Sequence, residues 1–80
     1  MSHLKDLVEY MAKSLVDYPD KVNISEVEAT ATSVIELRVA KEDLGKIIGK
    51  EGKTAKSIRI ILNAASSKLR RRTILNIIEE

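Results

Sequence analysis

Apolar residues near the start of the chain follow the spacing of one buried helical stripe. They recur three and four positions apart at Leu4, Leu7, Val8, Met11, Leu15 and Val16. Ser2 precedes them as a candidate N-cap, because its hydroxyl can accept a hydrogen bond from a free backbone N–H. Pro19 cannot continue a helix, so this first helix is expected to end near Tyr18.

The next twenty residues change to the alternating pattern of strands. Residues 21–30 alternate at first and then slip phase at Glu26-Val27, which predicts a strand with a bulge or an irregular end. Residues 31–33 are the expected turn. Residues 34–40 predict a clearer strand, and we expect the two strands to pair as a hairpin. The inward face of the second strand would carry Ile35, Leu37 and Val39.

The rest of the chain contains two more helical patterns and a third strand. Residues 41–46 indicate a short helix, and residues 53–69 indicate a long one. The apolar stripe of the long helix consists of Ala55, Ile58, Ile61, Leu62, Ala65 and Leu69. Residues 71–78 carry apolar side chains on both faces, which predicts a strand that is largely buried.

The order α-β-β-α-α-β predicts a single α+β domain over residues 1–80. Three strands can cover three helices only if the helices pack on one face of the sheet. We therefore expect a three-stranded sheet with three helices on one face, and a second face that is free or meets a partner. A chain of 80 residues buries only roughly 60% of its unfolded surface, so a large catalytic cleft is not expected.

The residue types argue against an enzyme, a metalloprotein or a membrane protein. The chain has no Cys and a single His, His3, so it offers no thiolate and no histidine cluster for a metal or for acid–base catalysis. Its apolar runs are short, and its first residues lack the pattern of a signal peptide. We expect no catalytic residue, no metal, no cofactor and no membrane contact, and a cytoplasmic location.

Positive charge is concentrated in the second half of the chain. Residues 1–40 hold four Lys or Arg against seven Asp or Glu, whereas residues 41–80 hold ten against five. A solvated basic face would account for this bias, and so would a site for an anionic polymer.

Two glycines, Gly49 and Gly52, stand three apart in the basic half, with Lys50 and Lys53 beside them. Glycine permits positive φ and the close approach of another chain, and the N-terminus of the helix that follows favours an anion. The P-loop and dinucleotide-binding patterns both require glycine at position 47, which is Ile. The alternatives are a phosphate site of another kind and a glycine-rich corner between two helices that binds no ligand.

The residues around these glycines resemble the signature of the KH domain, a module that binds single-stranded nucleic acid through a GxxG loop. The run from Leu44 to Thr54, followed by Ile58-Arg59, carries the resemblance. The preceding helix and strand are similar to the type II, prokaryotic arrangement, so the likeness extends over nearly the whole chain. In size, the chain most resembles small stand-alone bacterial KH proteins.

The resemblance implies which residues would contact single-stranded RNA. In KH domains the loop clamps the phosphates of about four nucleotides, and the bases lie in an apolar groove beside it. The implied RNA-binding residues are Ile48, Gly49, Lys50, Glu51, Gly52, Lys53, Lys56 and Arg59. Ile47, Ile58 and the strand around residues 37–39 are further candidates for the groove, although some of them must belong to the core. No aromatic residue lies near the loop, so the bases would meet aliphatic side chains.

Several charged residues around this site need separate comment. Lys56 would reach the RNA or be ordinary solvated surface. Glu51 sets a carboxylate beside the implied phosphates, so we expect it to point outward and to weaken nonspecific binding. Arg59 would reach the RNA or pair with an acidic group inside the fold. The run Arg70-Arg71-Arg72 would extend the RNA track, or would stabilise a helix C-terminus through the helix dipole.

The function implied by the resemblance is that of a non-enzymatic RNA chaperone or post-transcriptional regulator. The alternative is a protein-interaction subunit in which RNA binding is secondary. Ile60 and Ala64 lie off the apolar stripe of the long helix. They form a candidate partner surface, and the alternative is that Ile60 is an isolated exposed residue. The resemblance likewise implies a homodimer, or a heterodimer with another KH-containing protein. Joining two clamps would raise the effective local concentration of each.

Overall fold

A computed structural model of the chain describes residues 3–79, and its elements follow the predicted order. The helices and strands are α1 (His3–Leu15), β1 (Asn23–Glu28), β2 (Thr32–Arg38), α2 (Leu44–Ile48), α3 (Lys53–Lys68) and β3 (Arg72–Ile77). Single 3-10 turns connect them at Pro19–Lys21, Lys41–Asp43 and Lys50–Gly52. Ser2, the expected N-cap of α1, lies outside the described residues.

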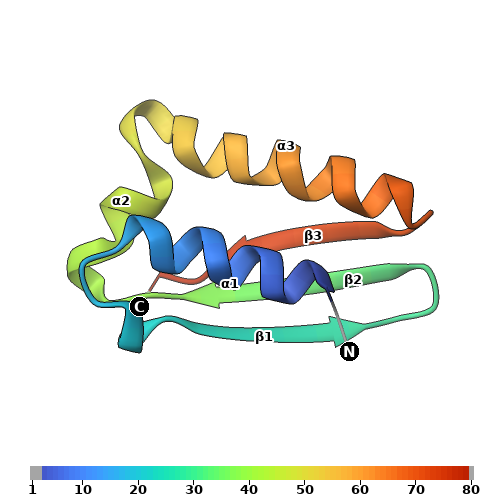
Figure 1. Cartoon of the computed structure of the whole chain (residues 1–80), viewed down its shortest axis with the longest axis horizontal. Coiled ribbons are helices and arrows are strands. Elements are labelled where there is room, and N and C mark those ends of the chain that lie inside the picture. The colour runs from blue at the N-terminus through green and yellow to red at the C-terminus, as the bar shows by residue number, and fades with distance from the viewer. Residues whose placement is uncertain (1–2, 80) are drawn as a thin grey trace.

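The strands form one mixed sheet in the order β1-β2-β3. β1 and β2 pair antiparallel as the predicted hairpin, and β3 pairs in parallel with the other side of β2. The helices lie together on one face of the sheet, with α2 and the loop after it at the end where β2 and β3 finish (Figure 1). This is the predicted α+β sandwich, and its topology agrees with a type II KH fold.

The core lies between the sheet and the two long helices. Alternate residues of β2 point into it, so Ile35 and Leu37 are fully buried while their neighbours are partly exposed. The buried apolar residues are Leu4, Val8, Ala12, Ile35, Leu37, Ile47, Ala55, Ile58, Leu62 and Leu75. This alternation fixes the register, because a slip of one residue would turn the apolar set of β2 toward solvent.

The first strand is regular, so the predicted bulge is wrong. All six residues of β1 pair with β2 without interruption. The sequence pattern slips because Val27 points to the open face of the sheet, where it is 61% exposed. The turn also comes earlier than expected, since the N–H of Ala29 donates to the carbonyl of Thr32 at 2.8 Å and Thr32 already belongs to β2.

Some apolar residues that were expected in the core are exposed. β3 is an edge strand, and its outward residues Ile74 and Asn76 are exposed, so the prediction of a largely buried strand is wrong. In the predicted stripe of the long helix, Ile61 and Leu69 are also exposed, and Leu69 lies just after the end of α3. Ile61 borders a groove between α1 and α3 instead of lying beneath it, because α1 covers only the inner part of the stripe.

Candidate nucleic-acid interface

The loop between α2 and α3 has a backbone that requires glycine at its first position. Gly49 has φ 76° and ψ 175°, a region that is essentially restricted to glycine. A Cβ at Gly49 would also lie 2.8 Å from the backbone nitrogen of Thr54, which real Cβ atoms essentially never do. Gly52 has the left-handed values φ 75° and ψ 10°, but a Cβ there would meet nothing within 4 Å. Gly49 therefore lets the loop pack against the start of α3, whereas Gly52 only allows the turn.

The two residues between the glycines are exposed, and Glu51 points outward as expected. Glu51 has φ 57°, a left-handed value that costs energy for a residue with a Cβ. The N–H of Gly52 donates to the carbonyl of Gly49 at 3.2 Å and closes a compact turn. No side chain among the described residues caps α3, so the first N–H groups of this helix are available to an anion beside Lys50.

One side of α2 belongs to the core, and another side is open. Ile47 is fully buried, so this candidate groove residue is a core residue. Leu44, Gly45 and Ile48 are spaced as neighbours on a common side of the helix. Leu44 and Ile48 are partly exposed, Gly45 is exposed, and a Cβ on Gly45 would meet nothing within 4 Å. The open side of α2, defined by these three residues, leads directly into the loop.

The strand that packs against α3 is β3, and the expectation of a groove wall around residues 37–39 fails at its first position. Leu37 is fully buried, as is nearly all of Ile58, the other candidate groove residue. A cleft of about 230 Å³ lies between α3 and β3, lined by residues of both elements. Arg59 forms part of this cleft, and its Nη2 donates to the backbone carbonyl of Leu75 at 3.3 Å. Arg59 thus contacts the free edge of β3 and not an acidic group inside the fold.

The basic residues at the start of α3 lie on two sides of the helix. Lys56 and Arg59 follow Gly52 by four and seven positions, so all three lie on one stripe. Because Arg59 contacts β3, this is the side of α3 that faces the cleft. Lys53 is seven residues before Ile60, so both lie on the same side of α3, which is exposed to solvent. The structure therefore brings the loop, Lys56 and Arg59 together and sets Lys53 slightly apart.

A buried carboxylate, which the sequence patterns did not reveal, joins α2 to the end of α1. Asp43 is fully buried, and its two oxygens accept hydrogen bonds from the backbone N–H groups of Asp17 at 3.1 Å and Tyr18 at 3.0 Å. Because these two N–H groups donate to Asp43, they are not available for helical hydrogen bonds, and α1 ends at Leu15 and not near Tyr18. An Asp before a helix is an ordinary N-cap signal, so its position in the sequence could not reveal a partner 25 residues away.

Lys46 reinforces this connection from the surface. Its Nζ lies 3.2 Å from the carboxylate of Asp17 and 3.8 Å from that of Asp43. The hydrogen bond that Lys46 donates to Asp17 and the charge of Asp17 raise the pKa of Lys46 above its ordinary value of 10.5, and the charge of Asp43 raises it further. The connection fixes α2, and with it the loop that α2 carries.

The three arginines after α3 have different surroundings. Arg71 is engaged within the fold, because its Nη2 donates to Ser33 Oγ at 2.9 Å and its Nη1 lies 3.7 Å from Glu28. Arg70 takes the left-handed conformation, with φ 57°, at the end of the helix. Arg72 lines the cleft between α3 and β3. Of the three, Arg72 is the one beside the candidate RNA path.

The candidate partner surface lies on the outer side of α3. Ile60 is 59% exposed, and Ala64, one helical turn further on, is exposed as well. Next to them, Ile61 borders the apolar groove between α1 and α3 together with Tyr10 and Leu15. Exposed apolar residues therefore extend from α3 across the groove to α1.

Within residues 3–79, no helix is long and apolar enough to cross a membrane. The same residues contain no group of three or more His, Asp or Glu side chains arranged to hold a metal ion.

Comparison with known proteins identifies one family over most of the chain. Residues 5–77 match the family model described as KhpA/KhpB, KH domain. The RNA-binding protein KhpA of Aquifex aeolicus is 52% identical over 79 residues, which are 99% of this chain and 100% of that protein. The proteins of the same name from Clostridium acetobutylicum and Chlamydia pneumoniae are each 49% identical, over 94% and 96% of this chain and 100% and 99% of their own. No solved structure matches the chain.

Proposed function

The chain belongs to the KhpA/KhpB family of KH domains, and from this membership we propose that residues 1–80 act as one KH domain that binds short single-stranded RNA. The Gly49–Gly52 loop clamps the phosphates, and the aliphatic surface beside it takes the bases. The protein acts without catalysis, in the cytoplasm, as an RNA chaperone or a post-transcriptional regulator. Relatives that are similar over their full length carry the name RNA-binding protein.

The backbone of the loop is the observation that carries this proposal. A turn that needs glycine at Gly49, exposes Lys50 and precedes an uncapped helix combines the features of a phosphate site. Backbone N–H groups and the dipole at the start of α3 favour negative charge. Lys56 and Arg59, on the stripe that continues from Gly52, extend the positive surface along the RNA backbone.

The bases meet two kinds of surface in this proposal. Ile48 and Gly45 on the open side of α2 offer apolar contact and room for close approach. Across from them, β3 is an edge strand, and Leu75 directs its carbonyl away from β2 toward Arg59. The backbone groups on this free edge can hydrogen-bond the edge of a base. Neither Tyr10 nor Tyr18 lines the cleft between α3 and β3, so the bases are held there without stacking on protein rings.

A variant that changes Lys50 and Glu51 both to Asp tests the clamp. Asp tolerates the left-handed conformation of position 51 better than most residues, so circular dichroism and thermal melting should stay close to those of the parent. The Kd for a short single-stranded RNA, followed by fluorescence anisotropy, should rise by about tenfold or more, because a charged contact is replaced by repulsion.

Lys68→Asp is the matched control, because it changes the net charge equally at the far end of α3. It should leave the Kd near the parental value. The clamp assignment is wrong if the loop variant is folded and binds RNA as tightly as the parent, or if the control weakens binding to the same extent.

Exposed apolar residues on α3 support a second function, in which the chain docks on another subunit. Ile60 and Ala64 lie beside the groove between α1 and α3, and together these surfaces suit a second copy of the chain. A stable interface of this kind buries about 800 Å² on each partner. We propose a homodimer formed through this surface, with a heterodimer with another KH-containing protein as the alternative outcome.

Light scattering tests the second function. The parent should have about twice the monomer mass of 8.9 kDa. The Ile60→Glu variant should have the mass of a single monomer. Val27→Glu, which alters a residue just as exposed on the opposite face, should remain a dimer. A parent that is monomeric alone but gains mass with a second KH-containing protein would assign the surface to a heterodimer.

A further inference from the structure

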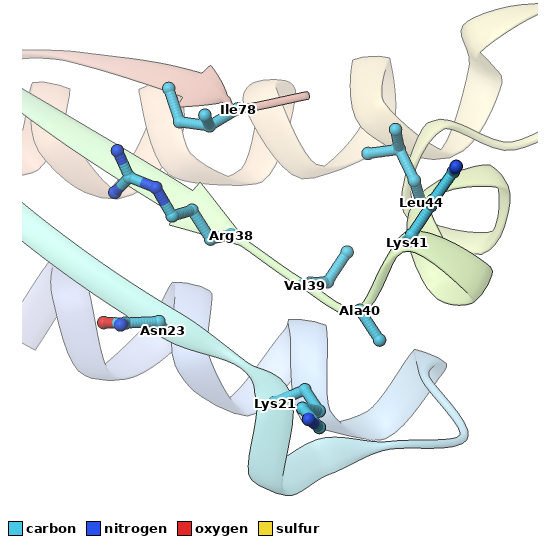
Figure 2. A pocket seen from close by; sticks show the side chains of 8 residues that line it. All are labelled: Lys21, Asn23, Arg38, Val39, Ala40, Lys41, Leu44 and Ile78. Atoms are coloured by element: carbon cyan, nitrogen blue, oxygen red, sulfur yellow. The ribbon is translucent and has the colours of Figure 1, made fainter. Parts of the chain in front are cut away.

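A pocket at the end of the sheet shares no lining residue with the cleft between α3 and β3 or with the groove between α1 and α3. This sheet-end pocket encloses about 250 Å³ and is lined by three basic residues, Lys21, Arg38 and Lys41, together with Asn23 and several apolar residues. None of the described lining residues is acidic. Figure 2 shows the pocket with the helices behind the sheet, so it opens on the face that the helices leave uncovered.

The three basic residues come from three separate segments of the chain. Lys21 ends the 3-10 turn before β1, Arg38 is the last residue of β2, and Lys41 begins the 3-10 turn before α2. Among the described residues, neither Lys21 nor Lys41 has a carboxylate within ion-pair distance. The side chains of Arg38 and Lys41 point in different directions from the lining (Figure 2). Because none of the described lining residues is acidic, the net positive charge around the pocket favours an anion there.

The pocket adjoins the open side of α2. Leu44 lines the pocket and is also the first of the three residues that form this open side, which continues through Gly45 and Ile48 to the loop. From Leu44 to Gly49 the helix rises by about 8 Å. This length corresponds to roughly two or three nucleotides at about 3.4 Å per stacked nucleotide. A strand that is clamped at the loop and follows α2 therefore reaches the sheet-end pocket without crossing the molecule.

We propose that the sheet-end pocket binds a phosphate of the same RNA strand, beyond the nucleotides that the loop clamps. The inference rests on the proposed RNA clamp and lengthens its footprint. Lys21 and Lys41 neutralise the phosphate, while Val39 and Ile78 pack against the adjoining sugar or base. The volume of the pocket is several times the roughly 30 Å³ that one water molecule takes in the liquid, so a phosphate fits. Continuity with the clamped strand favours RNA over an acidic protein segment.

RNA length is the variable that separates the pocket from the clamp. The parent and a Lys21→Gln/Lys41→Gln variant are titrated with single-stranded RNAs of about four and about eight nucleotides at several salt concentrations. The variant should bind the longer RNA about fivefold more weakly or worse, and its log–log salt slope should be smaller by about 0.7 for each phosphate that the lysines no longer neutralise. Its affinity for the shorter RNA should match that of the parent. Lys13→Gln/Lys68→Gln, which removes the same charge elsewhere, should match the parent with both RNAs.

Each contrary result has a distinct meaning. If the parent binds neither RNA, the clamp and the pocket assignment both fail. If the parent binds both RNAs and the pocket variant binds the longer one equally well, the pocket assignment alone is overturned. It is also overturned if the control double variant weakens binding equally, since the effect is then one of net charge. An oligoglutamate peptide that binds more tightly than the longer RNA, and needs the same two lysines, would assign the pocket to an acidic protein segment.

Discussion

At the scale of single residues, the site depends on three glycines that the structure uses in different ways. Gly49 is confined both by its dihedral angles and by the nearness of Thr54. Gly52 is confined only by its positive φ, and Gly45 lies in α2 with open space beside it. The same substitution should therefore have a different effect at each of these positions.

Gly49→Ala should destabilise the protein far more than Gly52→Ala. At Gly52 the added methyl group meets nothing, so the cost is that of a left-handed residue, about 1–2 kcal/mol. At Gly49 a further steric cost from the backbone of Thr54 should bring the loss to about 3 kcal/mol or more. Urea unfolding measures both free energies. Equal losses in the two variants would show that Thr54 does not confine the loop.

Gly45→Ala should separate stability from binding. Alanine in place of glycine within a helix stabilises by about 0.5–1 kcal/mol, and the added methyl group meets no protein atom. If RNA lies against the open side of α2, the same methyl group should raise the Kd. Thermal melting and anisotropy on one preparation measure the two effects. An unchanged Kd would mean that RNA does not approach α2 at Gly45.

At the scale of elements, the position of α2 depends on one buried carboxylate. Asp43 accepts two backbone hydrogen bonds from the segment after α1, and α2 has only five residues. So short a helix is not stable by itself. The orientation of the loop is therefore set by the hydrogen bonds of Asp43 and by the burial of Ile47.

Asp43→Ala should destabilise the protein by about 1.5–3 kcal/mol, because two backbone donors lose a charged acceptor. Asp43→Asn keeps the shape and an oxygen acceptor, so it should cost less. Urea unfolding at neutral pH gives both values. A loss below about 0.5 kcal/mol for Asp43→Ala would mean that the connection to α1 contributes little.

Lys46 makes the same connection sensitive to alkaline pH. Its pKa is raised in the folded state by Asp17, so the stability it contributes is present below its ordinary pKa of 10.5 and is lost as pH rises through the folded value. The melting temperature of the parent should therefore fall more steeply than that of Lys46→Met between about pH 9 and pH 12. Lys68→Met, which alters an exposed lysine at the far end of α3, should follow the parent. Parallel curves for the parent and Lys46→Met would contradict the raised pKa.

The order of the elements along the chain can be predicted from apolar periodicity. Which elements pair or pack with one another cannot. Ile35 and Leu37 alternate clearly, so β2 and its inward face could be predicted. Residues 71–78 look equally apolar on both faces, and only the sheet order reveals that β3 is an edge strand. The contact between Arg59 and Leu75 and the hydrogen bonds of Asp43 join distant segments. No local pattern encodes such contacts.

At the scale of the whole molecule, the proposed functions occupy different faces. The loop and α2 lie at one end of the helical layer (Figure 1), and the candidate partner surface lies on the outer side of α3. The sheet-end pocket opens on the opposite side of the sheet, beside α2 (Figure 2). Two copies that met through α3 would keep both loops accessible, and linking two weak clamps strengthens binding.

The central claim is that RNA is held at the loop, the open side of α2 and the edge of β3. Amide chemical-shift mapping by NMR, with a single-stranded RNA of about four nucleotides, tests this claim most directly. We predict the largest shifts at Ile48 to Gly52, with smaller shifts at Gly45, Lys56 and Leu75. Shifts confined to other surfaces, or saturable RNA binding that leaves the amides of Gly49 to Gly52 unmoved, would contradict the account.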